Sequence, residues 1–239
     1  MGYKVFSRQR CSPHLQPVAI TWPRRTTIAR MWSRVLVGIA VVVVSGVLPT
    51  ASARQTSTWQ SLFDGRTLDG WEETPFGGEG MVRVRNGQIV MEFGEPLTGL
   101  TRRGPVPRMS YEIRLEAMRL AGSDFFCGLT FPVGETSCSL ILGGWGGTTV
   151  GLSNIDEQDA SGNETTQYIK FEDRRWYAVR VRVTEARITA WLDDRQIIDV
   201  ETAGKSIGIR PEVDLSRPLG IAAYRTRAAI RGIEIRTLE

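Results

Sequence analysis

The densest group of side chains able to do acid–base or metal chemistry lies between Asn154 and Thr166. It contains Asp156, Asp159 and Glu164. Paired carboxylates flanking a glycosidic bond are the catalytic groups of most glycosidases. Loops of this kind also bind calcium through carboxylate and carbonyl oxygens, which makes Asp156 and Asp159 candidate metal ligands. A solvated acidic loop is the third interpretation, because acidic loop residues are mostly exposed.

A single tryptophan surrounded by glycines precedes this acidic stretch, in the segment Gly143-Gly144-Trp145-Gly146-Gly147. Glycines let the backbone turn tightly and can leave the indole exposed. An exposed Trp face stacks well against a pyranose ring, so Trp145 is a candidate sugar platform. The alternative is a hairpin loop whose Trp caps the core.

Two further tryptophans lie in runs of alternating polarity. Trp191 has the opposite parity to Ile188, Ala190 and Leu192, so it points to the other face of its strand. There it is a ligand platform if the face is a groove, and structural if a loop covers it. Trp176 opens the most regular run, and we expect it in the core.

The composition excludes several kinds of chemistry. Seven of the 30 basic residues and none of the 26 acidic residues lie in residues 1–53, which leaves 23 basic and 26 acidic residues in the rest. This balance argues against a nucleic-acid partner. The single histidine is His14, so residues 54–239 offer no Ser-His-Asp triad, no His base and no His ligand for zinc.

The N-terminal segment has the pattern of a secretory signal peptide. An apolar run from Val35 to Leu48 follows Arg34 and precedes Ala51-Ser52-Ala53, which predicts cleavage after Ala53. The run is shorter than the roughly 20 residues that span a bilayer, so we expect no stable membrane insertion after cleavage; an uncleaved anchor is the alternative. Met31 is a second candidate start. The predicted location is periplasmic or extracellular.

Export implies an oxidising compartment, where two cysteines would remain after cleavage. Cys127 and Cys138 lie on adjacent strand-like runs and could form one disulfide across a hairpin. The alternative is a pair of buried small apolar side chains. We favour the disulfide, because exposed free thiols are a liability outside the cell.

The elements that must position these residues are short strands. Runs rich in Val, Ile, Tyr, Phe and Trp recur through the chain, and turn signals such as Asn86-Gly87 and Asp193-Asp194 separate many of them. Tyr177 to Val183 alternates apolar and polar residues, as an antiparallel strand with one wet face does. The pattern predicts an all-β, two-sheet antiparallel β-sandwich, a jelly roll, over residues 59–239, after a short linker at 54–58.

The opening of this region carries a fairly specific motif. Leu62-Phe63-Asp64-Gly65-Arg66-Thr67-Leu68-Asp69-Gly70-Trp71 resembles the start of the 3-keto-disaccharide hydrolase family, long known as domain of unknown function 1080. Later stretches fit the family in the same order, among them 84–89, 111–116, 176–181 and 232–235. The resemblance covers about residues 59–238 and implies a concanavalin A-like lectin and glucanase fold.

The resemblance also implies a reaction, cleavage of the glycosidic bond of a 3-keto sugar. The keto group acidifies the C2 hydrogen, so the C1 substituent can be eliminated and water added. That chemistry needs a base near C2 and an electrophile on the ketone, often a metal. Many members carry an Asn-Ser-Gly-(Ile/Leu)-x-(Phe/Tyr)-Arg strand. This chain has Ser123-Asp124-Phe125-Phe126-Cys127-Gly128-Leu129 there, without the Arg.

The predicted site therefore uses Asp124, Asp156 and Glu164 as acid/base groups or ligands of a divalent metal, with Glu112 as a further contact to the substrate. The predicted function is an exported hydrolase or lyase that acts on (3-keto) disaccharides or other glycosides. The alternative is a non-catalytic carbohydrate-binding or cell-envelope interaction module of the same fold. A clustering of three or more carboxylates or amides in one cleft would favour the enzyme.

Overall fold

Strand β11 (Tyr177–Val183) shows how the alternation of side chains builds the fold. Tyr177, Val179, Val181 and Val183 are buried, while Arg180 and the other intervening residues reach the surface. The strand pairs antiparallel with β6 (Tyr111–Gly122) on one side and β12 (Arg187–Leu192) on the other. One face of the sheet therefore packs in the core and the other meets solvent.

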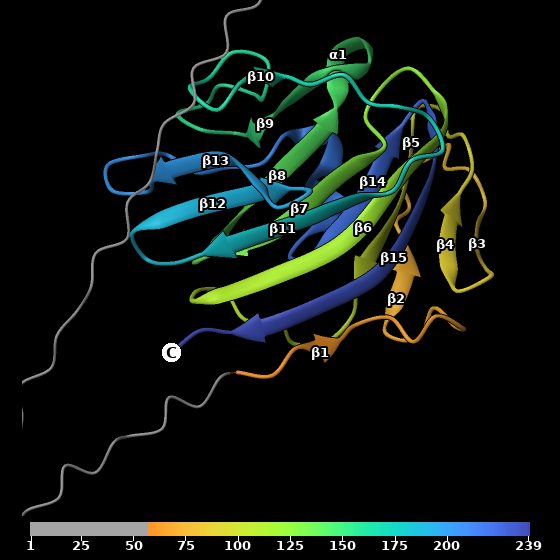
Figure 1. Ribbon diagram of the computed structural model, residues 1–239, viewed down its shortest axis with the longest axis horizontal. Helices are drawn as coiled ribbons and strands as arrows, with labels where there is room; N and C mark the ends of the chain where they lie inside the picture. Colours follow the sequence, from red (N-terminus) through yellow and green to blue (C-terminus); the bar gives the residue numbers. More distant parts are fainter. Residues whose placement is uncertain (1–56) are drawn as a thin grey trace, which may run out of the picture. The chain divides into compact units, whose positions relative to one another are not determined.

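The computed structural model describes residues 57–239, which form two antiparallel sheets packed face to face (Figure 1). Within these residues, sheet A has eight strands in the order β13-β12-β11-β6-β15-β4-β3, with β1 paired to β15. Sheet B has seven, in the order β10-β9-β8-β7-β14-β5-β2. This arrangement confirms the predicted all-β sandwich.

The remaining strands of both sheets have eight residues or fewer, except β15, which has 12. Those of sheet A are β1 (Gln60–Ser61), β3 (Val82–Arg85), β4 (Gln88–Met91), β13 (Arg195–Glu201) and β15 (Thr226–Thr237). Those of sheet B are β2 (Trp71–Glu73), β5 (Leu97–Arg102), β7 (Cys127–Val133), β8 (Thr136–Gly143), β9 (Thr149–Ser153), β10 (Gln167–Tyr168) and β14 (Gly220–Tyr224). Two short helical turns, α1 (Gly144–Gly147) and the 3-10 turn η1 (Pro211–Ser216), complete the elements of the described residues.

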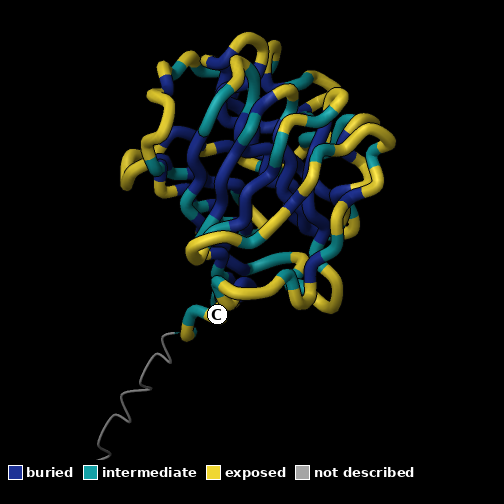
Figure 2. Tube along the Cα trace, turned by 90° about the vertical axis from the view of Figure 1, so that its right-hand side faces the viewer, coloured by how far each residue is buried: buried dark blue, intermediate teal, exposed yellow. Residues whose placement is uncertain are grey.

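The core lies between the two sheets, and exposed residues gather in the loops (Figure 2). At its centre Phe126, Phe171 and Tyr177 form an aromatic cluster, in which Phe171 meets each of the other two rings edge to face at 5.0 Å between centroids. Edge-to-face packing of this kind stabilises a core beyond simple burial. The family-like opening motif is part of this core, because the buried indole of Trp71 donates a hydrogen bond to the carbonyl of Leu62 at 2.7 Å.

Candidate functional site

The outer face of sheet B forms the floor of a cleft. In β8, Leu140 and Leu142 pack in the core, whereas Ser139 and Ile141 of the same strand line the cleft. Ser153 at the end of β9 lies on the same floor. Side chains as short as serine leave room above the sheet. Because its side chains alternate between the two faces of sheet B, β8 contributes both to the core and to the floor of the cleft.

The cleft has a volume of about 290 Å³, near the lower end of the range of about 300–1,000 Å³ typical of small-ligand sites. Its walls come from the loop around Trp145, the strands β5 and β14, and the segment that crosses sheet B before and within η1. The lining residues are Pro96, Leu97, Asp124, Phe125, Ser139, Ile141, Trp145, Ser153, Arg210, Glu212, Val213 and Tyr224. Aromatic faces and a few charged groups thus meet in one space.

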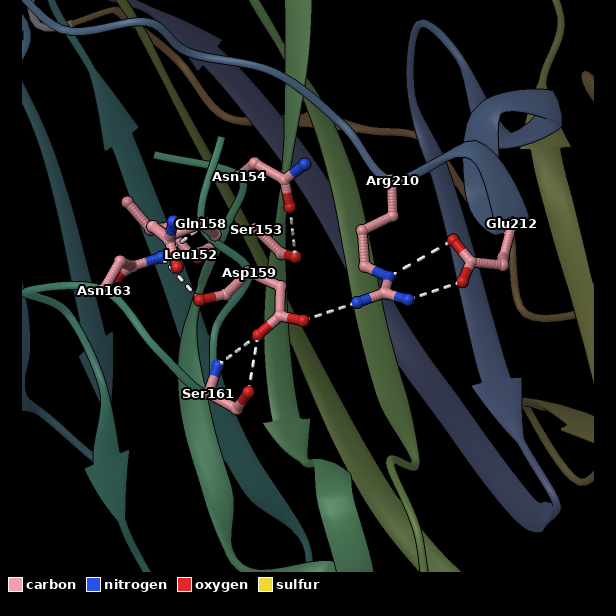
Figure 3. A network of polar contacts seen from close by, with 9 residues as sticks. All are labelled: Leu152, Ser153, Asn154, Gln158, Asp159, Ser161, Asn163, Arg210 and Glu212. Atoms are coloured by element: carbon pink, nitrogen blue, oxygen red, sulfur yellow. Dashed lines mark hydrogen bonds and ion pairs between the residues drawn. The ribbon is translucent and has the colours of Figure 1, made fainter. Parts of the chain in front are cut away.

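Arg210 is held between two carboxylates at the wall of the cleft (Figure 3). Its Nη1 donates to Oδ2 of Asp159 at 2.5 Å, while Nε and Nη2 donate to the two oxygens of Glu212 at 3.2 and 2.5 Å. The guanidinium carbon lies 5.9 Å from the ring centre of Trp145, within the range of a cation–π contact. These contacts fix the cation beside the indole.

The loop that carries Asp159 is itself tied down. Asp159 accepts hydrogen bonds from the backbone N–H and the hydroxyl of Ser161 at 2.8 and 2.6 Å. The amide of Asn163 donates to the carbonyls of Leu152, Gln158 and Asp159 at 2.7, 3.0 and 2.9 Å (Figure 3). Three backbone carbonyls are therefore bound by one side chain, which joins the loop to the end of β9.

Both carboxylates beside Arg210 have a lowered pKa. Burial acts to raise the pKa of Asp159, but the hydrogen bonds from Ser161 and the nearby Arg210 outweigh it and leave the pKa below its ordinary value. The hydrogen bonds from Arg210 lower the pKa of Glu212. Both groups are ionised at neutral pH, so they orient the cation rather than supply protons.

Asp124 enters the cleft from the start of the β7 segment. One carboxylate oxygen accepts the backbone N–H of Phe125 at 2.8 Å and the other accepts the N–H of Gly146 at 3.4 Å. Among the described residues, no Lys or Arg nitrogen lies within 4.0 Å of this carboxylate. Asp124 thus faces the cleft as an anion without a cationic partner.

Trp145 stands on an unusual piece of backbone. Its φ and ψ are 48° and 55°, a left-handed conformation that is uncommon for a residue other than glycine. Gly143 and Gly146 on either side also have positive φ, which explains the glycines around it. The indole is 43% exposed and lines the cleft. This conformation leaves the ring open to a ligand.

Comparison with known families shows which family the chain belongs to. Residues 58–236 match the 3-keto-alpha-glucoside-1,2-lyase-like domain. The chain belongs to this family. The match confirms the resemblance found in the sequence and spans nearly all the described residues. A search of curated proteins found no match to the chain.

Solved structures share the fold of this 3-keto-glucoside lyase-like domain. The Crh5 transglycosylase in complex with NAG superimposes with a TM-score of 0.51 at 9% identity, covering 76% of this chain and 84% of that one. A protein of unknown function with a galectin-like fold from Bacillus subtilis gives 0.50 at 8% identity, covering 72% and 92%. The carbohydrate binding module CBM66 from Bacillus subtilis gives 0.48 at 10% identity, covering 70% and 96%.

At these identities the likenesses to the transglycosylase and the galectin-like protein show the fold alone. Membership of the 3-keto-alpha-glucoside-1,2-lyase-like family places the chain with carbohydrate-active proteins. This is the coarse function that the sequence predicted.

Two of the predicted acid/base residues of this family member lie outside the cleft lining. Lys205 binds Glu164 at 2.7 Å and Asp156 at 3.5 Å between nitrogen and oxygen. Asp156 also accepts the backbone N–H of Ser206 at 2.8 Å. The structure therefore brings Asp156 and Glu164 together around a lysine and does not bring them to Asp124. The expected clustering of these three carboxylates in one cleft is wrong.

The residues present do not fit the divalent metal that the sequence predicted at Asp156 and Asp159. Within residues 57–239, no group of three or more His, Cys, Asp or Glu side chains is placed to hold a metal ion. Asp156 is turned to Lys205, and Asp159 is bound to the guanidinium of Arg210. The cations beside the acidic loop are thus the side chains of Lys205 and Arg210, and the predicted metal site is wrong.

Trp191 and Glu112 lie on the outer face of sheet A, on a different sheet from the cleft. The guanidinium carbon of Arg180 lies 3.8 Å from the ring centre of Trp191, so an arginine already covers that face. Glu112 is fully buried and bound by Arg180, Arg182 and Arg236. Glu112 is therefore not open to a sugar, because arginines bind its buried carboxylate. Trp191 is half-buried and lines a hollow on this outer face together with Arg180, so its predicted role as a ligand platform stays a prediction.

Trp176 is likewise not a core residue. It is half-buried just before β11, and the guanidinium carbon of Arg231 lies 4.1 Å from its ring centre. The core position expected of it belongs to Tyr177, because the strand begins one residue later.

The predicted disulfide is wrong, because the register of the β7–β8 hairpin separates the cysteines. Cys127 pairs with Leu142 and Cys138 pairs with Phe131, so the two lie four residues apart along the ladder. That offset is about 13 Å at the rise of a strand, beyond the reach of a disulfide. Both thiols are free and buried in the core, and burial raises the pKa of each to about 12.

Sequence reasoning missed Arg210, Glu212 and Tyr224. The Arg that many family members carry in the strand after Ser123 is absent here, so the sequence prediction relied on carboxylates. The cation of the cleft, Arg210, comes from another part of the chain. The Arg210-Pro211-Glu212 spacing could have drawn notice, because a proline between two opposite charges fixes their separation.

The predicted signal peptide, its cleavage site and the start at Met31 lie outside the described residues. In the part of the chain that the structure describes, no helix is long and apolar enough to cross a membrane.

Proposed function

We propose that the protein binds a glycoside in the cleft beside Trp145 and cleaves the glycosidic bond of a 3-keto sugar unit. One observation carries this proposal. Asp124, an anion without a cationic partner among the described residues, and Arg210, a cation fixed by two carboxylates, line the same cleft next to an exposed tryptophan. A base and an electrophile are the two groups that elimination from a 3-keto sugar requires.

In the proposed reaction, the carboxylate of Asp124 takes the proton from C2 of the sugar. The electrons of that C–H bond form a C2–C3 double bond and place negative charge on the C3 oxygen. Arg210 stabilises this oxyanion. When the enolate collapses, the C1–O bond breaks and the leaving oxygen receives the proton from Asp124. Addition of water to the resulting C1–C2 double bond releases the 3-keto sugar.

The geometry supports Arg210 as the electrophile because its position is set before substrate arrives. Two carboxylates and a loop braced by Asn163 hold the guanidinium, so little reorganisation is needed when charge develops. Trp145 offers its exposed face to the sugar ring, which would orient C2 over the floor of the cleft.

The experiment compares the protein and its variants on 3-keto disaccharides and the matching ordinary disaccharides, following sugar release. We expect turnover of the 3-keto compounds alone. Asp124→Asn should lower kcat about 100-fold or more, as loss of a general base does. Asp156→Asn is the matched control, because this exposed aspartate lies outside the cleft lining, and it should retain turnover.

A binding module is the second candidate function, and one observation favours it. Asp159 and Glu212 are both paired with Arg210, which leaves Asp124 as the unpaired carboxylate of the cleft lining. Saturable sugar binding that is lost in Trp145→Ala, with no release of product, would establish this function and overturn catalysis.

A further inference from the structure

A second hollow adjoins the cleft at Pro96. It is lined by Phe93, Gly94, Glu95, Pro96 and Arg225, and Pro96 lines the first cleft as well. The two spaces share this residue as a common wall. The two hollows therefore adjoin at this residue.

The backbone around Pro96 is fixed on both sides. The N–H of Arg225 donates to the carbonyl of Pro96 at 2.8 Å, and the N–H of Tyr224 donates to the carbonyl of Phe125 at 3.0 Å. The N–H of Glu95 donates to the carbonyl of Gly78 at 2.7 Å. The segment after β4 and the turn after β14 are thus joined, which keeps the two hollows in one relative position.

The side chains of the second hollow suit a sugar ring. Phe93 is 51% exposed and offers an apolar face. Arg225 and Glu95 are exposed, and among residues 57–239 neither has an oppositely charged group within 4.0 Å. A guanidinium donates and a carboxylate accepts hydrogen bonds, so the pair can bind the hydroxyl groups at the rim of a ring stacked on Phe93.

We infer that this hollow is a second subsite, which binds the leaving unit of the glycoside and selects substrates whose leaving unit is a sugar ring. This inference rests on the proposed function, because it takes Trp145 and Arg210 as the subsite for the keto sugar. Phe93 is the stacking platform, and Arg225 and Glu95 bind hydroxyl groups. In this scheme Pro96 lies beside the scissile bond, between the two units.

The test compares two ligands, a 3-keto disaccharide and the methyl glycoside of the same 3-keto sugar. Affinities are measured by calorimetry with the Asp124→Asn variant, which keeps both ligands intact, and with the same variant carrying Phe93→Ala or Arg225→Gln. We expect each second substitution to lower the affinity for the disaccharide about fivefold to tenfold and to leave the affinity for the methyl glycoside unchanged. Tyr168→Ala and Arg195→Gln, exposed residues outside both hollows, are the matched controls.

Equal losses on both ligands, or no loss on the disaccharide, would overturn the second subsite while leaving the proposed function intact. If neither ligand binds the parent variant or the unmodified chain, the proposed function fails and this inference fails with it. The subsite would also be contradicted if the parent variant bound the methyl glycoside but had no higher affinity for the disaccharide.

Discussion

Arg210 owes its place in the cleft to three contacts that no single stretch of sequence contains. Asp159 lies 51 positions earlier in the chain, Glu212 two positions later, and Trp145 on a separate loop. The guanidinium has donors for both carboxylates at once because its N–H groups form a planar fork. A lysine would present a single point charge and could not hold the same two partners in this geometry.

Arg210→Gln should lower kcat/KM for the 3-keto glycoside about 100-fold, since the oxyanion loses its fixed cation. Arg210→Lys should recover part of this loss, because the charge returns without the fork. Initial rates over a range of substrate concentrations test both. Arg195→Gln on β13 is the control and should match the parent protein. Equal rates for Arg210→Gln and the parent would exclude Arg210 from the reaction.

The thiols of Cys127 and Cys138 should be inert in the folded protein. Both are fully buried, and burial holds the pKa of each at about 12, so the reactive thiolate is scarce at pH 8. Alkylation followed by mass spectrometry of the peptides should show no label on Cys127 or Cys138 in the native protein and one label on each after denaturation without reductant. Failure to label the denatured chain until reductant is added would reveal a bridge and contradict the register of β7 and β8.

At this scale the sequence predicted Asp124 and Trp145 as site residues, and the structure places both in one cleft. Glycines around a tryptophan are a local signal, since they report the positive φ that the turn requires. The acidic loop misled the prediction for a physical reason. The cations that pair with its carboxylates, Lys205 and Arg210, lie more than 40 residues later, and charge density in a sequence does not show such pairing.

Among the elements, β6, β11 and β15 show how sheet A manages charge on its outer face. Glu112 on β6 is fully buried, yet three arginines bind its carboxylate, two from β11 and one from β15. Burial acts to raise the pKa of Glu112, but the hydrogen bonds and charges of Arg182 and Arg236 lower it below the ordinary value of 4.5. Glu112 and its three arginines thus join β6, β11 and β15 through one carboxylate.

Glu112→Gln should destabilise the protein by about 2 kcal/mol, because buried hydrogen bonds to a charged group are lost. The ionised carboxylate stabilises the fold fully above about pH 4.5, and this contribution is lost as the pH falls through the lowered pKa of the folded state. Denaturant unfolding at pH 7 and pH 3 measures both effects. The difference in stability between parent and variant should shrink at pH 3; an unchanged difference would argue against the ionised form.

Strands were predictable where an apolar run either alternates with polar residues, as in β11, or is continuous, as in the runs that carry Cys127 and Cys138 in β7 and β8. The alternating run from Tyr177 to Val183 coincides with β11. Strand β9 was missed because a glycine lies at its centre, and Gly151 is needed there since Ala160 covers it, with the carbonyl oxygen 2.8 Å from where a Cβ would lie. A loop that packs on a strand removes the polar face on which sequence patterns depend.

For the molecule as a whole, the motif that reveals the family is separate from the residues that line the cleft. Leu62, Phe63 and Trp71 are core residues, and Asp64 accepts the backbone N–H groups of Arg66 and Thr67 at 2.7 and 2.8 Å. These contacts secure the start of the domain. Membership of the family was therefore predictable from structural residues, whereas the chemistry we propose for this member depends on positions that the motif does not report.

We further propose that the domain is exported, with cleavage after Ala53. N-terminal sequencing of the protein recovered outside the cytoplasm should begin at Arg54. A chain starting at Arg54 should unfold at the same denaturant concentration as the recovered protein, because the core begins at Leu62. Recovery of the protein with residues 35–48 still attached would support an uncleaved anchor instead.

The environments of the tryptophans have an optical consequence. Among the described residues, Trp71 is buried and Trp59, Trp176 and Trp191 each lie against an arginine, while Trp145 is 43% exposed at the cleft. A sugar stacked on Trp145 would shield that one indole from water and from a soluble quencher such as acrylamide. The protein thus carries its own fluorescent reporter, so occupancy of the cleft can be followed by emission without attaching a dye.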